Sequence, residues 1–300
     1  VYNTLSLTAN SYTDIVGNTG PAGQTANYVV DTRAPTVSSI VISSATGIQN
    51  NFLNVGDNVS VTATFSEAVI VDNSSGNPTL TLVVGSTNRT AQYASGDNST
   101  QQVFRYTIQA GDNDSNGISI GADALDNNSG TIRDRAGNIT TNLTHSAVSH
   151  NDDYIVDTTP PTVSSVAITD AAGVQNSFLN AGDNVSVTAT FSEAVIVDNS
   201  SGNPTLTLVV GDDNRTATYT SGSGSTELVF RYTIQATGTS GENDPDGISI
   251  PQHALALNSG TIRDPAHNNA TLTHSAVSDN SSVKVDTTAP SVDNFTISDT

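Results

Sequence analysis

One thirty-residue segment occurs twice in this chain, letter for letter, and it constrains the fold more than any other feature. The segment GDNVSVTATFSEAVIVDNSSGNPTLTLVVG spans residues 56–85 and recurs at residues 182–211, an offset of 126 positions. Repetition at a fixed period indicates that one structural unit is used again along the chain. The sequence therefore predicts tandem copies of a single module.

A second landmark sets the module boundaries. The sequence DTRAPTVSS begins at Asp31, DTTPPTVSS begins at Asp157, and DTTAPSV begins at Asp286. Each occurrence marks the start of a new copy. We expect residues 1–30 to be the C-terminal part of a preceding module, 31–156 to be repeat 1, 157–285 to be repeat 2, and 286–300 to begin a following module.

The pattern within one module is all β. Short segments with two-residue alternation or β-branched residues are separated by Gly, Asn, Asp and Pro clusters, and no 3.6-residue periodicity competes with them. In repeat 1 the expected strands are 36–43, 58–66, 78–84, 89–94, 101–109, 118–134 and 147–156. Seven short antiparallel strands in such a unit are typical of an immunoglobulin-like sandwich. We expect tandem immunoglobulin-like β-sandwich modules in an extended array.

Alternation also predicts which side chains form the core. In the second expected strand, Val59, Val61, Ala63 and Phe65 fall on one face, which we assign to the interior. The strand at 101–109 leaves two registers open, because either Val103 or Phe104 could point inward. Packing is the preferred interpretation of these apolar side chains.

Charge restricts the partners. The chain has 29 acidic and 9 basic residues, for a net charge of −20. Such a surface repels phosphate backbones and anionic lipid, so nucleic-acid binding is not expected. No apolar run approaches the roughly 20 residues of a membrane span, so we expect no membrane insertion. Cations are the natural partners, with simple solubility as the alternative explanation of the charge.

A polar loop with alternating oxygen-bearing side chains follows the fifth expected strand. Calcium takes six to eight oxygen ligands, and a D-x-D-x-[DN]-G loop offers side-chain oxygens at positions one, three and five and a carbonyl at position seven. The matching residues are Asp112, Asp114, Asn116 and Ile118 in repeat 1, and Glu242, Asp244, Asp246 and Ile248 in repeat 2. An Asx-rich turn uses the same residue types for hydrogen bonds to the main chain, and this alternative stays open.

Position twelve of this loop differs between the repeats. Asp123 could supply a carboxylate there in repeat 1, whereas His253 in repeat 2 is a poor calcium ligand. Asp112 is also exchanged for Glu242, and Gly137 for His267, so we expect the two repeats to bind ions with unequal affinity.

A second set of carboxylates is expected where modules join. Counting strand directions places the turn after the second strand, residues 66–74, at the same pole as the turn at 134–138 and the linker before the module. Glu67 and Asp134 should then lie beside Asp31, and Glu193 and Asp264 beside Asp157. A divalent cation would relieve the repulsion between such carboxylates. Turn acids exposed to water are the alternative.

Catalytic signatures are not found. The histidines at 145, 150, 253, 267 and 274 show no compact metal-binding spacing. No nucleophile elbow or phosphate-binding glycine loop is present in a strand-to-helix context. We expect a protein that is not an enzyme.

Taken together, the motifs DTTAPSV, GDNVSVTATFSEAV, PTLTL, FRYTI, DPDGI and NSGTIRD resemble the bacterial immunoglobulin-like extender repeats of giant RTX-type, type I-secreted adhesins and biofilm proteins. The resemblance covers both repeats and both partial ends. It implies an extracellular stalk at the bacterial cell surface, which calcium rigidifies and which projects distal binding domains. It also implies a metal role for Asp112, Asp114, Asn116, Glu242, Asp244 and Asp246, and for Glu67, Asp134, Asp157, Glu193, Asp264 and Asp286.

Two functions of different class stay open. One is a non-catalytic extender whose partners are calcium ions and the neighbouring modules of the same chain, which we expect to be a monomer. The other is an immunoglobulin-like module that binds a glycan or a surface. Sugar binding commonly uses aromatic stacking, and this chain has no Trp and only 8 Tyr. This composition favours the extender.

Overall fold

The computed structural model describes residues 3–236, 242–294 and 296. The chain is all β, and the described residues contain a single short 3-10 helix, Asp152–Tyr154, and no α-helix. In the same part of the chain, no helix is long and apolar enough to cross a lipid bilayer. Two compact units are present: unit 1 comprises 1–47, 56–108 and 114–155, and unit 2 comprises 48–55, 109–113 and 156–300.

Residues 3–30 form only a thin ribbon. Strands β1 (Ser6–Leu7) and β2 (Gly23–Gln24) pair antiparallel. Apolar side chains along this stretch stay exposed to solvent, among them Leu5, Ile15 and Val29.

A seven-stranded antiparallel sheet makes up most of unit 1. Its strands are β3 (Val37–Thr46), β5 (Asn58–Asp72), β6 (Thr79–Val84), β7 (Thr87–Ser95), β8 (Ser99–Thr107), β10 (Leu125–Asp126) and β11 (Thr131–Arg133). Their order is β10-β6-β7-β8-β5-β11, and β3 also pairs with β5. A separate three-stranded sheet has the order β4 (Phe52–Leu53), β12 (Ile155–Asp157), β9 (Asn113–Asp114).

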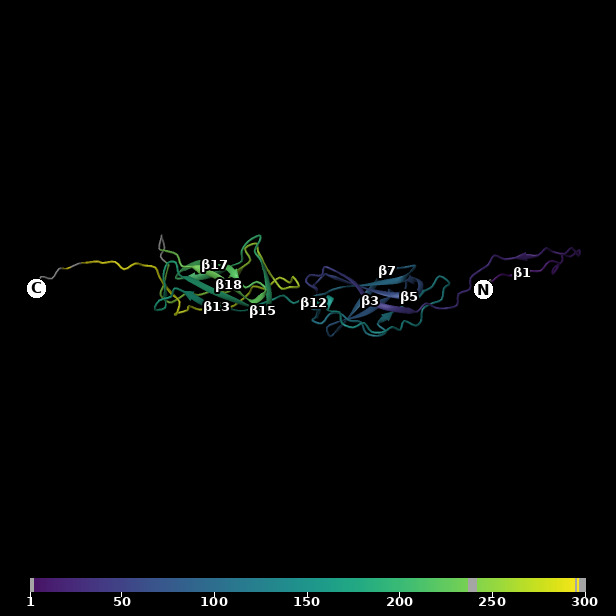
Figure 1. Cartoon of the computed structure of the whole chain (residues 1–300), viewed down its shortest axis with the longest axis horizontal. Coiled ribbons are helices and arrows are strands. Elements are labelled where there is room, and N and C mark those ends of the chain that lie inside the picture. The colour runs from purple at the N-terminus through teal and green to yellow at the C-terminus, as the bar shows by residue number, and fades with distance from the viewer. Residues whose placement is uncertain (1–2, 237–241, 295, 297–300) are drawn as a thin grey trace. The chain divides into compact units, whose positions relative to one another are not determined.

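Unit 2 repeats this topology. Its strands are β13 (Val163–Ala172), β15 (Asn184–Asp198), β16 (Thr205–Val210), β17 (Asp213–Ser221), β18 (Ser225–Thr233), β20 (Leu255–Ala256) and β21 (Thr261–Arg263). The order is β13-β15-β18-β17-β16-β20, with β21 paired to β15. Figure 1 shows β13, β15, β17 and β18 side by side. A three-stranded sheet again accompanies them, in the order β14 (Phe178–Leu179), β22 (Lys284–Asp286), β19 (Asn243–Asp244).

The longest strand of each unit is kinked in the middle. β15 pairs with β18 up to Thr190, shifts register before Val195, and then pairs with β21 at Ile196–Asp198. β5 has the same break between Thr64 and Val69. An irregularity of this kind bends the strand and redirects its side chains. The predicted turn at 66–74 is therefore wrong over most of its length, because the strand continues to Asp72.

The core follows the predicted alternation. Val59, Val61 and Ala63 are completely buried, and Phe65 is 2% exposed. At 101–109 the structure selects the register that buries Phe104, whose ring meets that of Tyr93 edge to face at 5.9 Å between centroids. Apolar side chains on one face of each curled antiparallel sheet are buried together, and this burial holds each unit together. The prediction of an all-β chain is confirmed.

Candidate metal centres

Two groups of three carboxylates are the most distinctive polar feature of the described residues. Asp31, Glu67 and Asp134 form the first group, in unit 1; Asp157, Glu193 and Asp264 form the second, in unit 2. Within each group, one carboxylate oxygen from every residue lies within 4.8 Å of the others. We call them the first and second acidic clusters. The sequence predicted both associations.

A tight turn after β21 orients the aspartate of the second cluster. Asn268 donates to Asp264 twice, from its main-chain N to Oδ1 and from Nδ2 to Oδ2, each at 2.8 Å. His267 has a positive φ of 69°, which lets the chain reverse within five residues. The turn after β11 is the same, with Asn138 donating to Asp134 at 2.8 and 2.7 Å. Local hydrogen bonds thus fix the orientation of both carboxylates.

The glutamate of each cluster lies at the kink of the long strand. Glu193 follows the part of β15 that pairs with β13 and precedes the part that pairs with β21. Ser192 N donates to the carbonyl of Thr162, which ties this kink to the start of β13 at 2.8 Å. Glu67 occupies the matching position, since Ser66 N donates to Thr36 O at 2.9 Å. Both glutamates are half-buried.

The third carboxylate of each cluster comes from the segment that leads into the first long strand. Asp157 Oδ1 accepts from Thr159 N at 2.9 Å, and its main-chain oxygen accepts from Asn268 Nδ2 at 3.0 Å. Asp31 repeats the arrangement with Arg33 N at 3.0 Å and Asn138 Nδ2 at 3.2 Å. The asparagine of the turn therefore joins the linker to the aspartate in both clusters.

Convergence of the carboxylates makes ionisation of the glutamates less favourable. Burial raises the pKa of Glu193, and the charges of Asp157 and Asp264 raise it further. The pKa of Glu67 is raised for the same reasons, first by burial and then by Asp31 and Asp134. Repulsion of this kind is relieved by a bound cation.

The aspartates differ between the two clusters. Burial raises the pKa of Asp264, with a further contribution from Asp157, despite the hydrogen bonds from Asn268. Burial acts in the same direction on Asp134, but the hydrogen bonds from Asn138 and the following turn outweigh it, so its pKa is lowered. Ionisation of Asp264 is therefore less favourable than ionisation of Asp134.

In repeat 1 the aspartates of the predicted calcium loop are hydrogen-bonded to main-chain amides. Asp112 Oδ2 accepts from Gln109 N at 2.9 Å. Asp114 Oδ2 accepts from Gly85 N at 2.7 Å, and its Oδ1 accepts from Asn116 N at 3.3 Å. Both aspartates are 2% exposed. The bond from Asn116 N to Asp114 is an Asx-turn bond, whereas those from Gln109 N and Gly85 N are not, and calcium binding at this loop stays a prediction.

The second loop carries a buried ion pair. Glu242 is 3% exposed, and its Oε1 lies 2.6 Å from Nε of Arg215 and also accepts from the hydroxyl of Tyr232. Its Oε2 accepts from Gln235 N at 2.6 Å. Burial raises the pKa of Tyr232, and the hydrogen bond to Glu242 adds to that shift. Charge at position one of this loop is thus neutralised by an arginine.

The other two aspartates of the second loop differ in burial: Asp244 is buried and Asp246 is exposed. Asp244 Oδ2 accepts from Gly211 N at 2.9 Å, and Oδ1 accepts from Gly247 N at 2.7 Å. Burial raises the pKa of Asp244, and the neighbouring Asp246 adds to the increase. Asp246 is exposed, as is Asn116 at the matching position of unit 1.

The remaining predicted ligands have structural contacts of their own. The side chains of Ile118 and Ile248 are buried in the cores, and the carbonyl of Ile248 accepts from Asn280 N at 3.1 Å. Asp123 Oδ1 accepts from His145 N at 2.9 Å. Asp286 Oδ1 accepts from Thr288 N at 2.9 Å, the same turn that Asp157 forms.

Sequence reasoning missed the arginine that pairs with the second loop. Arg215 lies in β17, far along the chain from Glu242, and only the folded sheet brings them together. One signal was present, because Arg89 and Tyr106 occupy the positions of Arg215 and Tyr232 in the other repeat. A basic residue retained in both repeats of so acidic a chain indicates a specific acidic partner.

No protein-family model matches the sequence, and no curated protein matches it.

Proposed function

We propose that this chain is a non-catalytic extender segment of a bacterial surface adhesin, built from immunoglobulin-like modules whose junctions are rigidified by Ca²⁺. The observation that carries the proposal is the acidic cluster at the start of each repeat, where a linker aspartate meets two carboxylates of the module that follows. The distal binding domains would lie elsewhere in the full protein.

The donor set of each cluster suits a hard divalent cation. Three carboxylates within 4.8 Å of one another offer oxygen atoms only. Calcium prefers carboxylate and carbonyl oxygens, and water can complete its six to eight ligands. The raised pKa values of Glu67 and Glu193 indicate negative charge that the protein's own groups leave partly uncompensated. A bound ion would supply that compensation.

The mechanical role follows from which segments the ion would join. Asp157 ends β12 and begins the linker, residues 157–162, that leads into β13. Glu193 lies at the kink of β15, and Asp264 lies in the turn after β21. An ion held by all three restricts the linker relative to the module. Apart from the ion, a side-chain bond from Asn268 Nδ2 to Asp157 O joins the linker to this turn, and main-chain bonds from Thr271 N to Pro161 O and from Ser192 N to Thr162 O hold the rest of the linker. Calcium would thus add a direct link between Asp157 and the two carboxylates of the module that follows.

Calcium titration of the metal-free chain tests the metal. A ligand that binds only the folded state at about 100 times its dissociation constant adds about 2.7 kcal/mol to the free energy of unfolding. We expect the thermal midpoint to rise with calcium and the radius of gyration from small-angle scattering to increase. An unchanged midpoint and scattering profile at millimolar calcium would contradict the proposal.

Variants locate the ion. Glu193→Gln removes one ligand of the second cluster and should abolish most of the calcium-induced stabilisation of unit 2. Glu227→Gln is the matched control, because Glu227 is exposed on β18 and outside both clusters. An equal calcium response in the two variants would exclude the second cluster as the site.

A third variant separates the cluster from the predicted calcium loop. Asp246→Asn places in unit 2 the residue that unit 1 already has at position 116, so the fold should tolerate it. If the cluster holds the ion, this variant responds to calcium as the wild type does. Loss of the response in Asp246→Asn would assign the site to the loop instead.

A further inference from the structure

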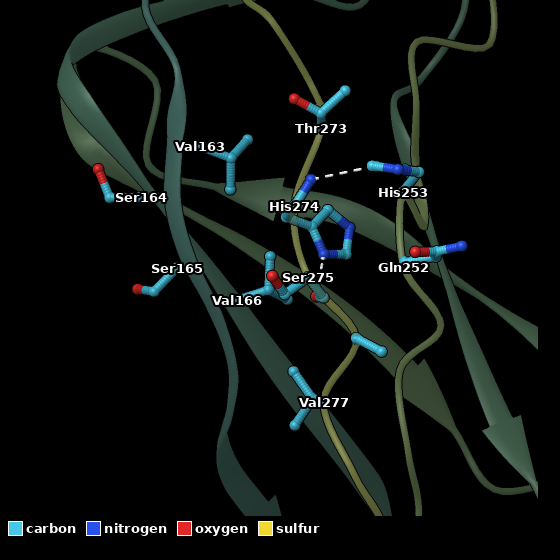
Figure 2. A pocket seen from close by; sticks show the side chains of 11 residues that line it. Val163, Ser164, Ser165, Val166, Gln252, His253, Thr273, His274, Ser275 and Val277 are labelled. Atoms are coloured by element: carbon cyan, nitrogen blue, oxygen red, sulfur yellow. Dashed lines mark hydrogen bonds between the residues drawn. The ribbon is translucent and has the colours of Figure 1, made fainter.

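An open groove of about 580 Å³ lies beside the first strand of unit 2. One wall is the start of β13, Val163–Val166, and the other is the segment 273–277. The two walls are joined at one end, where Thr271 N donates to Pro161 O at 2.8 Å. Figure 2 shows the ring of His274 within this groove, with Val163, Val166 and Val277 around it.

Both ring nitrogens of His274 are hydrogen-bonded to the main chain. Nε2 accepts from Ala254 N at 2.8 Å, and Nδ1 lies 2.8 Å from the carbonyl oxygen of Ser275. A carbonyl oxygen only accepts, so Nδ1 must carry the proton; a main-chain N–H only donates, so Nε2 must be unprotonated. The contacts therefore require the neutral ring in its Nδ1-protonated tautomer. The side chain is 8% exposed.

The neighbouring histidine is held in a neutral form as well. His253 Nδ1 accepts from His274 N at 3.2 Å, drawn as a dashed line in Figure 2, and the two rings are 6.3 Å apart at a steep angle. The other side chains that line the groove come from β13, from Gln252 and from the segment of His274 itself, and they are uncharged. His253 is thus the only other titratable group among these lining residues.

Unit 1 keeps the same arrangement with one exchange. His145 Nε2 accepts from Ala124 N at 2.8 Å, and its Nδ1 lies 2.8 Å from Ser146 O. At the position of His253, however, unit 1 has Asp123, whose carboxylate accepts from His145 N. The main-chain N–H at this histidine position thus donates to a carboxylate in unit 1 and to a histidine ring in unit 2. The fold therefore needs a hydrogen-bond acceptor at this position rather than a particular residue.

We propose that His274 is an acid-sensitive latch that ties the segment 273–277 to the 252–254 loop while its ring is neutral and loosens this tie when the ring takes up a proton, which leaves the main-chain bond from His253 N to His274 O at 3.3 Å. Protonation places a hydrogen on Nε2, directly opposite the N–H of Ala254, so the hydrogen bond is lost. Protonation of His253 removes the adjacent bond in the same way and places a second positive charge near the first. The latch does not depend on metal at the acidic clusters.

The test uses the full chain in the absence of calcium. Ring nitrogen and carbon NMR shifts of the wild type report the tautomer of His274 directly, and amide hydrogen exchange of Ala254, corrected for the intrinsic rate, reports the latch. Free histidine takes up a proton near pH 6.5, and one excluded proton lowers the closed-to-open ratio about tenfold for each pH unit below that. We expect the protection of Ala254 to fall between pH 7.5 and pH 5.5.

Variants separate the latch from general acid sensitivity. His274→Gln retains an amide oxygen that can accept from Ala254 N but cannot take up a proton, so its Ala254 protection should not change with pH. His253→Asp, which copies unit 1, should leave a weaker pH dependence than the wild type. His150→Gln is the control for removing a histidine elsewhere and should behave as the wild type.

Three outcomes would overturn the proposal. One is an Nε2-protonated ring of His274 in the wild type at pH 7.5. The second is protection of Ala254 that is constant across this pH range in the wild type. The third is the same loss of protection on acidification in His274→Gln as in the wild type. The first two measurements need no variant, so the test holds even if a substitution prevents folding.

Discussion

At the scale of single residues, three five-residue turns fold alike in three different surroundings. In the N-terminal ribbon, Asn18 donates to Asp14 from its main-chain N at 2.9 Å and from Nδ2 at 2.8 Å, as Asn138 and Asn268 do in units 1 and 2. The turn forms in the ribbon although the side chains there are exposed. Its geometry is therefore encoded locally, by an aspartate and an asparagine four positions later.

This local encoding explains which parts of the site could be predicted. Asp134 and Asp264 were identified by counting strand directions, and the turn that each begins needs no distant contact. The ion pair between Arg215 and Glu242 could not be found in this way, because it depends on the register between β17 and its neighbours. Spacing in the sequence predicts turns, whereas pairing across a sheet decides which charges meet.

The turn in unit 2 contains a residue poorly suited to its conformation. His267 has φ of 69°, whereas Gly137 has the matching place in unit 1 with φ of 95°. A side chain in the left-handed region costs roughly 1 kcal/mol relative to glycine. We expect His267→Gly to raise the free energy of unfolding of unit 2 by about that amount in urea titrations. Gly137→Ala should lower that of unit 1, and a stabilising Gly137→Ala would contradict this explanation.

A buried polar side chain distinguishes the cores of the two units. Gln102 is fully buried, and its Oε1 has no hydrogen-bond partner among the described residues, whereas Leu228 occupies this place in unit 2. Nε2 of Gln102 donates to Gly96 O and Ser99 O, each at 2.8 Å, so the cost falls on the oxygen. Burying an unpaired amide oxygen costs about 1–3 kcal/mol. We therefore expect Leu228→Gln to destabilise unit 2 by this amount, measured by denaturant unfolding. Gln102→Leu is the reverse exchange, and a comparable destabilisation by it would show that the amide is required.

At the scale of elements, the sequence predicted which carboxylates meet, but it assigned the glutamates to the wrong kind of element. Counting strands assigned Glu67 to a turn after the second strand, yet it lies within β5. The glutamate still meets Asp134, because the kink brings that part of β5 next to the start of β3 while the rest continues to β11. Strand ends are poorly marked in this sequence, since the apolar run AVIV at 68–71 follows directly on the preceding alternation.

Close contact between two loops limits what residue 76 can be. A Cβ atom added to Gly76 would lie 1.9 Å from the carbonyl oxygen of Asn128, so one loop would have to move. Overpacking of this kind typically costs about 1–3 kcal/mol. Gly76→Ala should destabilise unit 1 by an amount in this range in denaturant unfolding. Gly121→Ala is the control, because nothing lies within 4 Å of its added Cβ; equal effects of the two substitutions would rule out the loop contact as the cause.

At the scale of the whole molecule, charge is the dominant constraint. A chain with a net charge of −20 repels itself, and the acidic clusters concentrate part of that repulsion where carboxylates meet. Composition alone indicated cations as partners, and counting strand directions indicated where the carboxylates gather. Neither could show that the aspartates of the two clusters differ in pKa, because that difference depends on burial and on hydrogen bonds within the folded turn.

The pH dependence of the metal-free chain follows from the raised pKa of Glu193. The ordinary pKa of a glutamate is 4.5, and in the folded chain that of Glu193 is higher, so the folded state binds this proton more tightly than the unfolded state. Its contribution to stability is therefore fully present below pH 4.5 and is lost as the pH rises through the higher folded value. Ionised Glu193 lowers the stability of the metal-free chain at pH 7.

Glu193→Gln should consequently have opposite effects with and without calcium. In chelator at pH 7 it should stabilise unit 2, because it removes a repelled charge, and this gain should disappear by about pH 4, where the wild-type side chain is protonated. In calcium at pH 7 the same substitution should destabilise unit 2, because it removes a ligand of the bound ion. Urea unfolding of both proteins under the three conditions measures these differences, with Glu227→Gln as the control. Stabilisation of equal size in chelator and in calcium would show that repulsion operates at the cluster but that no ion relieves it.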